Sequence, residues 1–116
     1  MPSARGKALG VQVSLDGELP TGTSNRQLLA MAMSECVTNC VRHAGATELY
    51  IHLRNTGNTS TVTITNNGAV PEETIREGGG LSALRRRISD AGGHMTIYSR
   101  PRFALVVILP GKEVDQ

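Results

Sequence analysis

Four polar side chains within one short segment have the types that bind a metal ion and a polyphosphate. They are Glu35, Asn39, Arg42 and His43, and on a helix they would fall within an arc of roughly 100°. Apolar residues would take the remaining side: Leu29, Met33, Cys36, Val37, Cys40 and Ala44. Mg²⁺ accepts a neutral carboxamide oxygen beside water and phosphate oxygens. The segment therefore predicts one wall of a nucleotide site, although most amphipathic helices simply expose their polar face to water.

Two further segments have residues that can present backbone groups to a ligand. Asn66-Asn67-Gly68 follows a predicted strand and suits either a ligand-presenting turn or an ordinary Asn-Gly turn. Gly78-Gly79-Gly80-Leu81 opens a predicted helix, whose N-terminal amides carry a partial positive charge and can hold phosphate. The second segment lacks the Lys-Ser/Thr ending of the Walker loop, which disfavours that class of nucleotide-binding protein.

Hydrophobic spacing predicts the elements that would position these groups. One helix is expected from a cap at Ser24 or Asn25 to about His43, and a second across Leu81 to Ala91 with a stop at Gly92-Gly93. Residues 1–9 are expected to be a loose lead-in. Strands are predicted around Val11–Leu15, Glu48–Leu53, Val62–Ile64, Met95–Ile97 and Phe103–Leu109, with a turn at residues 55–58 and a lid at about 69–79.

These elements predict an α/β (α+β) two-layer sandwich that forms a single domain over residues 10–116. Helices would cover one face of a mixed, mostly antiparallel sheet of about five strands. The other face would be wetter, because Tyr50, His52, Thr61 and Thr63 alternate with the apolar positions. Phe103 to Leu109 is apolar on both faces, which is typical of a central strand.

Composition excludes several classes of protein. The chain has 116 residues, 39 % of them hydrophobic, and a net charge of +2, which fits one globular domain and gives no argument for nucleic acid. No apolar run approaches the ~18 residues of a membrane span, and no secretory signal opens the chain. Cys36 and Cys40 lie one helical turn apart on the apolar side, so we expect reduced, core-filling thiols and a cytoplasmic location.

The motifs in their order along the chain are far more specific than each alone. Glu-x-x-x-Asn-x-x-x-His-Ala is followed by Asn-Asn-Gly, Gly-Gly-Gly-Leu, Leu-Arg-Arg-Arg-Ile, Ala-Gly-Gly, Ser-Arg-Pro and a final Leu-Pro. From about Gly10 to Pro110 this order resembles the catalytic ATP-binding domain of bacterial two-component sensor histidine kinases, in the GHKL superfamily. The resemblance implies the histidine kinase-like ATPase fold, with ATP and Mg²⁺ as ligands.

The resemblance also implies a role for each candidate residue. Asn39 corresponds to the Mg²⁺-binding asparagine, and Glu35 to the family's conserved glutamate, which would orient metal-bound water or the nucleophile. Phosphate-side contacts are implied for Arg42 and His43, and a close backbone approach to phosphate for the glycine-rich helix start at Gly78, Gly80 and Leu81. Gly68 corresponds to the glycine of the adenine-side motif.

The chain departs from the family pattern at two places on the adenine side. Asn66 stands where the family usually has an aspartate that accepts a hydrogen bond from the adenine amino group. A neutral acceptor there would weaken binding by an amount on the order of 1 kcal/mol. The segment from Arg100 to Ala104 also lacks the glycine element that commonly precedes the last strand.

The function implied is presentation of Mg-ATP for transfer of the γ-phosphoryl group to a histidine on a separate dimerisation domain of the same kinase. A response regulator would be an indirect partner, with no nucleic acid and no direct membrane contact by this domain. The chain would be part of the cytoplasmic portion of a membrane-bound receptor. Two alternatives stay open: a serine kinase or switch protein of the anti-sigma-factor type, and a degenerate interaction domain without catalysis.

Overall fold

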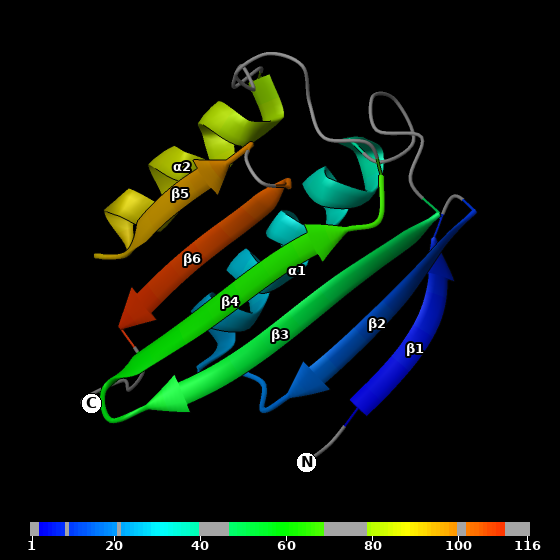
Figure 1. The fold of residues 1–116 in the computed structure, drawn as a ribbon. Helices are drawn as coiled ribbons and strands as arrows, with labels where there is room; N and C mark the ends of the chain where they lie inside the picture. The colour runs from blue at the N-terminus through cyan, green and yellow to red at the C-terminus, as the bar shows by residue number, and fades with distance from the viewer. Residues whose placement is uncertain are drawn as a thin grey trace.

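A single six-stranded sheet organises the chain in a computed structural model, which describes residues 3–8, 10–20, 22–39, 47–68, 79–99 and 102–110. The spatial order of the strands is β1-β2-β3-β4-β6-β5 (Figure 1). The strands are β1 (Ser3–Ala8), β2 (Val11–Gly17), β3 (Glu48–Thr56), β4 (Thr59–Asn66), β5 (His94–Tyr98) and β6 (Ala104–Pro110). The helices are α1 (Thr23–Asn39) and α2 (Gly79–Asp90).

The sheet is mixed, and one parallel pair places α1 against it. β2 and β3 are parallel, with Asp16 opposite His52, so the chain must cross between them, and α1 lies in that connection. The other neighbours are antiparallel. β3 and β4 form a hairpin whose last pair, Thr56 and Thr59, leaves a two-residue turn at Gly57-Asn58, as the sequence predicted.

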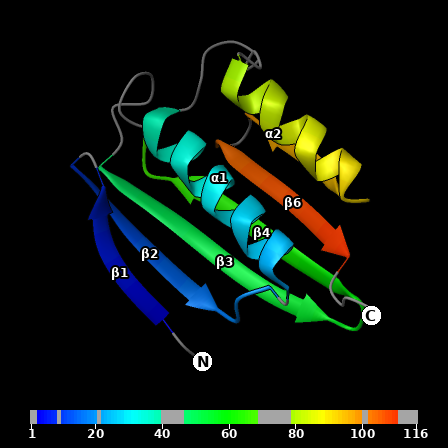
Figure 2. The ribbon, with the colours of Figure 1, turned by 180° about the vertical axis from the view of Figure 1, so that it is seen from behind.

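Both helices lie on the same face of the sheet, which gives a two-layer molecule (Figure 2). Apolar side chains between the layers form the core. Leu49, Ile51 and Ile64 on the inner strands and Leu84 and Ile88 on α2 are at most 1 % exposed. This confirms the predicted α/β sandwich and the period-two and helical spacing on which the prediction depended.

Backbone hydrogen bonds show where α1 begins and where α2 ends. The carbonyl oxygen of Gly22 accepts the N–H of Arg26 at 3.2 Å, so Gly22 and not Ser24 or Asn25 caps α1. α2 ends in a Schellman arrangement, with Gly93 N–H donating to Ile88 O at 2.8 Å and Gly92 at φ 84°. The predicted stop of α2 at these glycines is confirmed.

Two expectations were wrong. Residues 3–8 form the edge strand β1, paired with β2 from Ser3–Asp16 to Ala8–Val11, and are not a loose lead-in. They add a sixth strand to the predicted sheet of about five. β6 lies between β4 and β5 but is buried on one face only, because no second layer covers the other face. Ile108 is consequently 40 % exposed.

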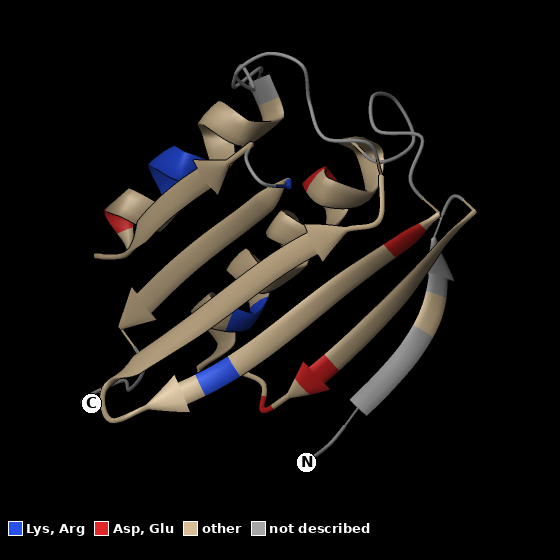
Figure 3. Ribbon diagram, in the orientation of Figure 1, with Lys and Arg blue, Asp and Glu red and all other residues tan. Residues whose placement is uncertain are grey.

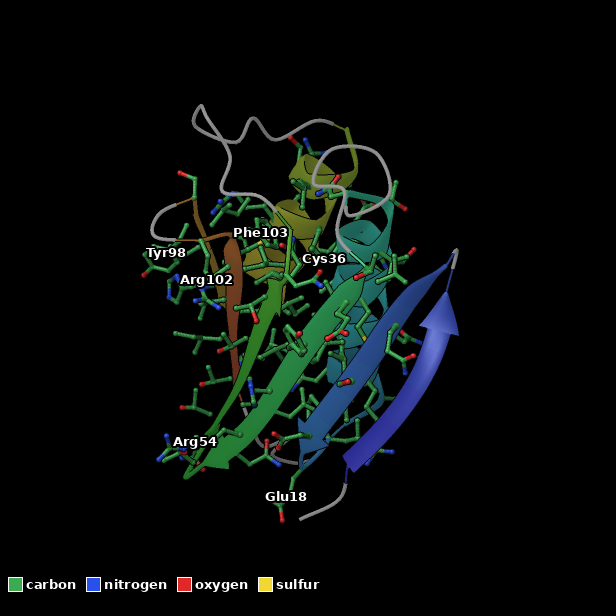
Figure 4. All side chains as sticks on the ribbon, turned by 45° about the vertical axis from the view of Figure 1, so that its right-hand side comes forward. Glu18, Cys36, Arg54, Tyr98, Arg102 and Phe103 are labelled. Carbon is green, nitrogen blue, oxygen red and sulfur yellow. The ribbon has the colours of Figure 1, made fainter. Side chains whose placement is uncertain are left out.

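The uncovered face of the sheet is polar, as predicted. Tyr50, His52, Thr61 and Thr63 are exposed or half-buried there, and Arg54, Tyr98 and Arg102 project from the side away from the helices (Figure 4). His52 Nδ1 lies 3.0 Å from Asp16 Oδ2. In the part of the chain that is described, neither helix is long and apolar enough to cross a membrane.

Candidate functional site

The end of α1, the end of β4 and the first turn of α2 lie at one end of the molecule (Figures 1 and 2). These are the three places where the sequence puts its candidate residues. Glu35 and Asn39 occupy the last turns of α1, Asn66 ends β4, and Gly80 and Leu81 belong to the first turn of α2. The fold therefore brings to one end groups that are separated by tens of residues in the chain.

The carboxylate of Glu35 lies directly against Gly80. A Cβ atom added to Gly80 would overlap Oε1 and Cδ of Glu35 and would lie 2.5 Å from Oε2. Because Gly80 is in the first turn of α2, the carboxylate is held at the helix end that carries partial positive charge. The absence of a side chain at Gly80 is what allows this approach.

Asn66 ends the inward-facing series of β4, after Val62 and Ile64, and is only 6 % exposed. Its Oδ1 accepts the N–H of Gly68 at 2.8 Å. A backbone N–H can be met only by the oxygen of a carboxamide, so this bond also determines where the nitrogen lies. Among the described residues, no acceptor is recorded for Nδ2 of Asn66.

Asn67 is a structural residue that the sequence reasoning did not separate from Asn66. Its Oδ1 accepts the N–H groups of Thr47 at 3.0 Å and Glu48 at 2.9 Å, and its Nδ2 donates to Thr47 Oγ1 at 3.0 Å. These bonds hold the start of β3 to the end of β4. The period of two from Val62 and Ile64 would have assigned Asn66 to the inner face and Asn67 to the outer one.

The remaining candidates divide between described and undescribed positions. Asn39 is half-buried at the end of α1 and Gly68 half-buried after β4, whereas Leu81 is 5 % exposed and packs in the core. Arg42, His43 and Gly78 lie outside the described residues, as do Cys40 and the lid predicted at about 69–79, except its last residue, Gly79. Cys36 is buried, as predicted, and lies with Phe103 between the layers (Figure 4).

The described residues supply no cluster from which protein side chains alone could bind a metal. No group of three or more His, Cys, Asp or Glu residues lies within reach of a common ion in that part of the chain. Mg²⁺ is compatible with this, because it is usually bound by one or two protein oxygens together with water and substrate phosphates. The described charges lie on both helices and on strands of the sheet (Figure 3), and α2 carries three consecutive arginines, Arg85, Arg86 and Arg87.

Two further interactions, one of Arg85 and one of Tyr50, have structural roles. Arg85 Nη1 donates to the carbonyl oxygen of Met95 at 2.6 Å, which ties α2 to β5. On the uncovered face, Tyr50 donates a hydrogen bond to Glu48. That bond, together with some desolvation and the nearby carboxylate charge, raises the pKa of Tyr50 above its usual value, while Arg102 lowers it slightly.

Comparison with known families and structures gives a consistent result. The family described as histidine kinase-, DNA gyrase B-, and HSP90-like ATPase matches residues 24–113. A search of curated protein sequences gives no match. The family match includes α1, the hairpin of β3 and β4, and α2, which are the elements that carry the candidate residues.

Solved structures with the same fold include kinase domains of low sequence identity. The ATP binding domain of PrrB from Mycobacterium tuberculosis is 21 % identical, with a TM-score of 0.67, and the match covers 91 % of this chain and 84 % of that one. The EL346 blue-light activated histidine kinase of Erythrobacter litoralis is 16 % identical, with a TM-score of 0.67 and coverage of 89 % and 38 %. The histidine kinase AdeS of Acinetobacter baumannii is 14 % identical, with a TM-score of 0.62 and coverage of 76 % and 48 %. The chain thus spans about half or less of the last two proteins.

Proposed function

We propose, from the premise that this chain belongs to the family of histidine kinase-, DNA gyrase B-, and HSP90-like ATPases, that it binds Mg-ATP and presents the γ-phosphoryl group to a histidine. That histidine would belong to a separate dimerisation domain of the same kinase. The same fold in the ATP binding domain of PrrB and in two histidine kinases supports this role.

The observation that carries the proposal is the contact between Glu35 and Gly80. It places a carboxylate at the N-terminal turn of α2, where backbone N–H groups and the helix dipole favour phosphate. Phosphoryl transfer depends mainly on positioning and on stabilising charge along the line of attack. A carboxylate beside the phosphate-binding end can orient the incoming histidine or a water for that attack.

The opposite end of the nucleotide would reach Asn66. The Nδ2 group is a buried donor without an acceptor in the described part of the chain, and a nucleobase edge would satisfy it. Asn66 and Glu35 come from different layers, β4 and α1. A nucleotide bound to both would therefore lie across the end of the sandwich, over Gly68 and the first turn of α2.

Mg²⁺, when bound, would neutralise charge on the phosphate oxygens. Asn39 would hold it through Oδ1, because this residue follows Glu35 by one helical turn on the same side of α1. Arg42 and His43 would contact phosphates from the segment that follows. We further propose that the domain functions in the cytoplasmic part of a receptor, with a response regulator as an indirect partner.

Titration calorimetry with ATP, with and without Mg²⁺, tests the proposal. Asn39→Ala should remove the Mg²⁺ dependence of ATP affinity while the far-ultraviolet circular dichroism stays unchanged. Asn58→Ala, in the hairpin turn of β3 and β4, is the matched control and should keep that dependence. Absence of measurable heat at millimolar nucleotide would contradict nucleotide binding altogether, and Mg²⁺-coupled affinity that survives Asn39→Ala would contradict the metal assignment.

A second experiment separates the kinase from its two alternatives. With a dimerisation domain that carries the acceptor histidine, labelled phosphate from ATP should be transferred to that domain in an acid-labile, base-stable linkage. Transfer to serine of a partner protein would instead support the anti-sigma-factor type. The degenerate interaction domain is favoured by one observation, the neutral Asn66 in place of a carboxylate, and it predicts no nucleotide binding.

A further inference from the structure

The carboxamide of Asn66 has a defined orientation. Its Oδ1 accepts the N–H of Gly68 at 2.8 Å, and the amide nitrogen must then lie on the other branch of the side chain. Because Asn66 is 6 % exposed, its Nδ2 cannot rely on bulk water for an acceptor. No described residue supplies one.

A buried donor without an acceptor selects the ligand that can pair with it. A carboxylate at this position only accepts hydrogen bonds, so it pairs with the 6-amino group of adenine. The carboxamide of Asn66 instead leaves two N–H groups for a ligand, because its oxygen is already bonded to Gly68. The group on a purine that pairs with an N–H donor at the same place is a 6-oxo group.

We infer that Asn66 makes this site accept a purine nucleoside triphosphate with a 6-oxo base, guanine or hypoxanthine, at least as well as ATP. The inference rests on the proposed function, since it concerns the base end of the same nucleotide. The oxygen of Asn66 has a second lone pair that adenine could use, but that arrangement leaves both N–H groups of Nδ2 buried and unpaired. A 6-oxo base accepts one of these N–H groups and leaves the bond to Gly68 intact.

The sequence neighbour Asn67 provides a matched control. It has the same side chain one position along, but its amide is occupied by Thr47 and Glu48 and lies on the outer side of the strand end, where it is exposed. A change from amide to carboxylate at Asn67 alters the same chemical group without altering what the base meets. Any effect on base preference should therefore be confined to Asn66.

The test compares three triphosphates that differ at the C6 edge of the purine: ATP, ITP, whose N1 also carries a hydrogen, and purine riboside triphosphate, which has hydrogen at C6. Dissociation constants are measured by calorimetry with the whole chain at constant Mg²⁺. ITP should bind the unaltered protein at least as tightly as ATP. In Asn66→Asp the order should reverse, with ATP about tenfold tighter than ITP, the usual effect of replacing a matched buried hydrogen bond by a mismatched one.

The outcomes separate this inference from the proposed function. Binding of none of the three triphosphates would contradict the nucleotide site itself. Tighter binding of ATP than of ITP by the unaltered protein would overturn the role of Nδ2 while leaving nucleotide binding in place. An ATP-to-ITP ratio that changes in Asn67→Asp as much as in Asn66→Asp would also overturn it. Because the carboxylate of Asn66→Asp can still accept the Gly68 N–H, the variant should fold, and circular dichroism verifies this before titration.

Discussion

The contact between Glu35 and Gly80 can be measured through stability, without nucleotide. The perturbation is Gly80→Ala, which adds a Cβ atom where the structure has the Glu35 carboxylate. Alanine suits a helix better than glycine by about 1 kcal/mol. The obstacle is the far end of a flexible side chain, so Glu35 should move and the fold should persist.

The expected magnitudes follow from the two opposing effects. Displacing Glu35 from its rotamer costs about 0.5–1.5 kcal/mol, and its carboxylate loses about 0.3–1 kcal/mol of interaction with the start of α2. Gly80→Ala should therefore change the free energy of unfolding by no more than about 1 kcal/mol, and any change should be a decrease. In a Glu35→Ala background nothing obstructs the new methyl group, and the same change should stabilise by up to about 1 kcal/mol.

Urea denaturation of the four proteins of this double-mutant cycle provides the assay. The coupling energy should be about 1–2 kcal/mol, well above the ~0.5 kcal/mol by which independent sites deviate from additivity. Ala83→Gly, at an exposed position of α2, is the control: it should destabilise by about 0.5–1 kcal/mol in both backgrounds. If Gly80→Ala and Glu35→Ala prove additive, the two residues do not touch and the reasoning about this end of the site is wrong.

Three other changes test contacts within and beside the strands of the sheet. Gly17→Ala should destabilise the protein by about 3 kcal/mol in urea denaturation, because φ is 106° and the new Cβ would overlap a backbone carbonyl of β3; a loss below 1 kcal/mol would be inconsistent with this register. Asn67→Ala should lower the free energy of unfolding by about 1–2 kcal/mol, because its hydrogen bonds to the start of β3 are lost. Amide hydrogen exchange at the start of β3 should accelerate, and unchanged exchange would argue against these bonds. Tyr50, whose pKa is raised chiefly by its bond to Glu48, should ionise above ~10. The stability that this bond contributes should be present below that pH and be lost as the pH rises through the folded-state pKa. Tyrosinate absorbance, with Tyr50→Phe as the control, measures the ionisation of Tyr50. Ionisation at or below pH ~10 would contradict the assignment.

The sequence predicts the fold best where the alternation of hydrophobic and polar residues is strongest. β3 alternates Leu49, Ile51 and Leu53 with polar residues, and its burial repeats that pattern residue by residue. β1 has no such signal, because an edge strand is held by backbone hydrogen bonds to β2 and needs no apolar side chains. The start of α1 was misplaced for a related reason: its N-cap residue is Gly22, which has no side chain that could mark the position in the sequence.

The sequence indicates the residue types of the candidate site but not the contacts between them. Spacing on a helix sufficed to group Glu35 with Asn39, since both lie within one turn of α1. The approach of Glu35 to Gly80 joins residues from different helices, and no local pattern encodes such a distance. The orientation of Asn66 likewise depends on a bond to Gly68 that a resemblance in residue type does not reveal.

The position of Glu35 implies a competition at the start of α2. Its carboxylate occupies the helix end that would also attract the phosphates of a nucleotide, and two anions at one positive end repel each other. Glu35→Gln retains the shape of the side chain and removes this repulsion, which is worth about 1 kcal/mol for partly screened charges. ATP affinity should therefore rise about fivefold, while phosphoryl transfer to an added histidine domain falls by a factor of about 10² or more if the carboxylate orients the nucleophile. Calorimetry and labelled transfer measure the two quantities on the same variant. A rise in ATP affinity together with a fall in phosphoryl transfer would show that the carboxylate competes with phosphate and does not only support the helix. An ATP affinity that stays constant or weakens would refute the competition.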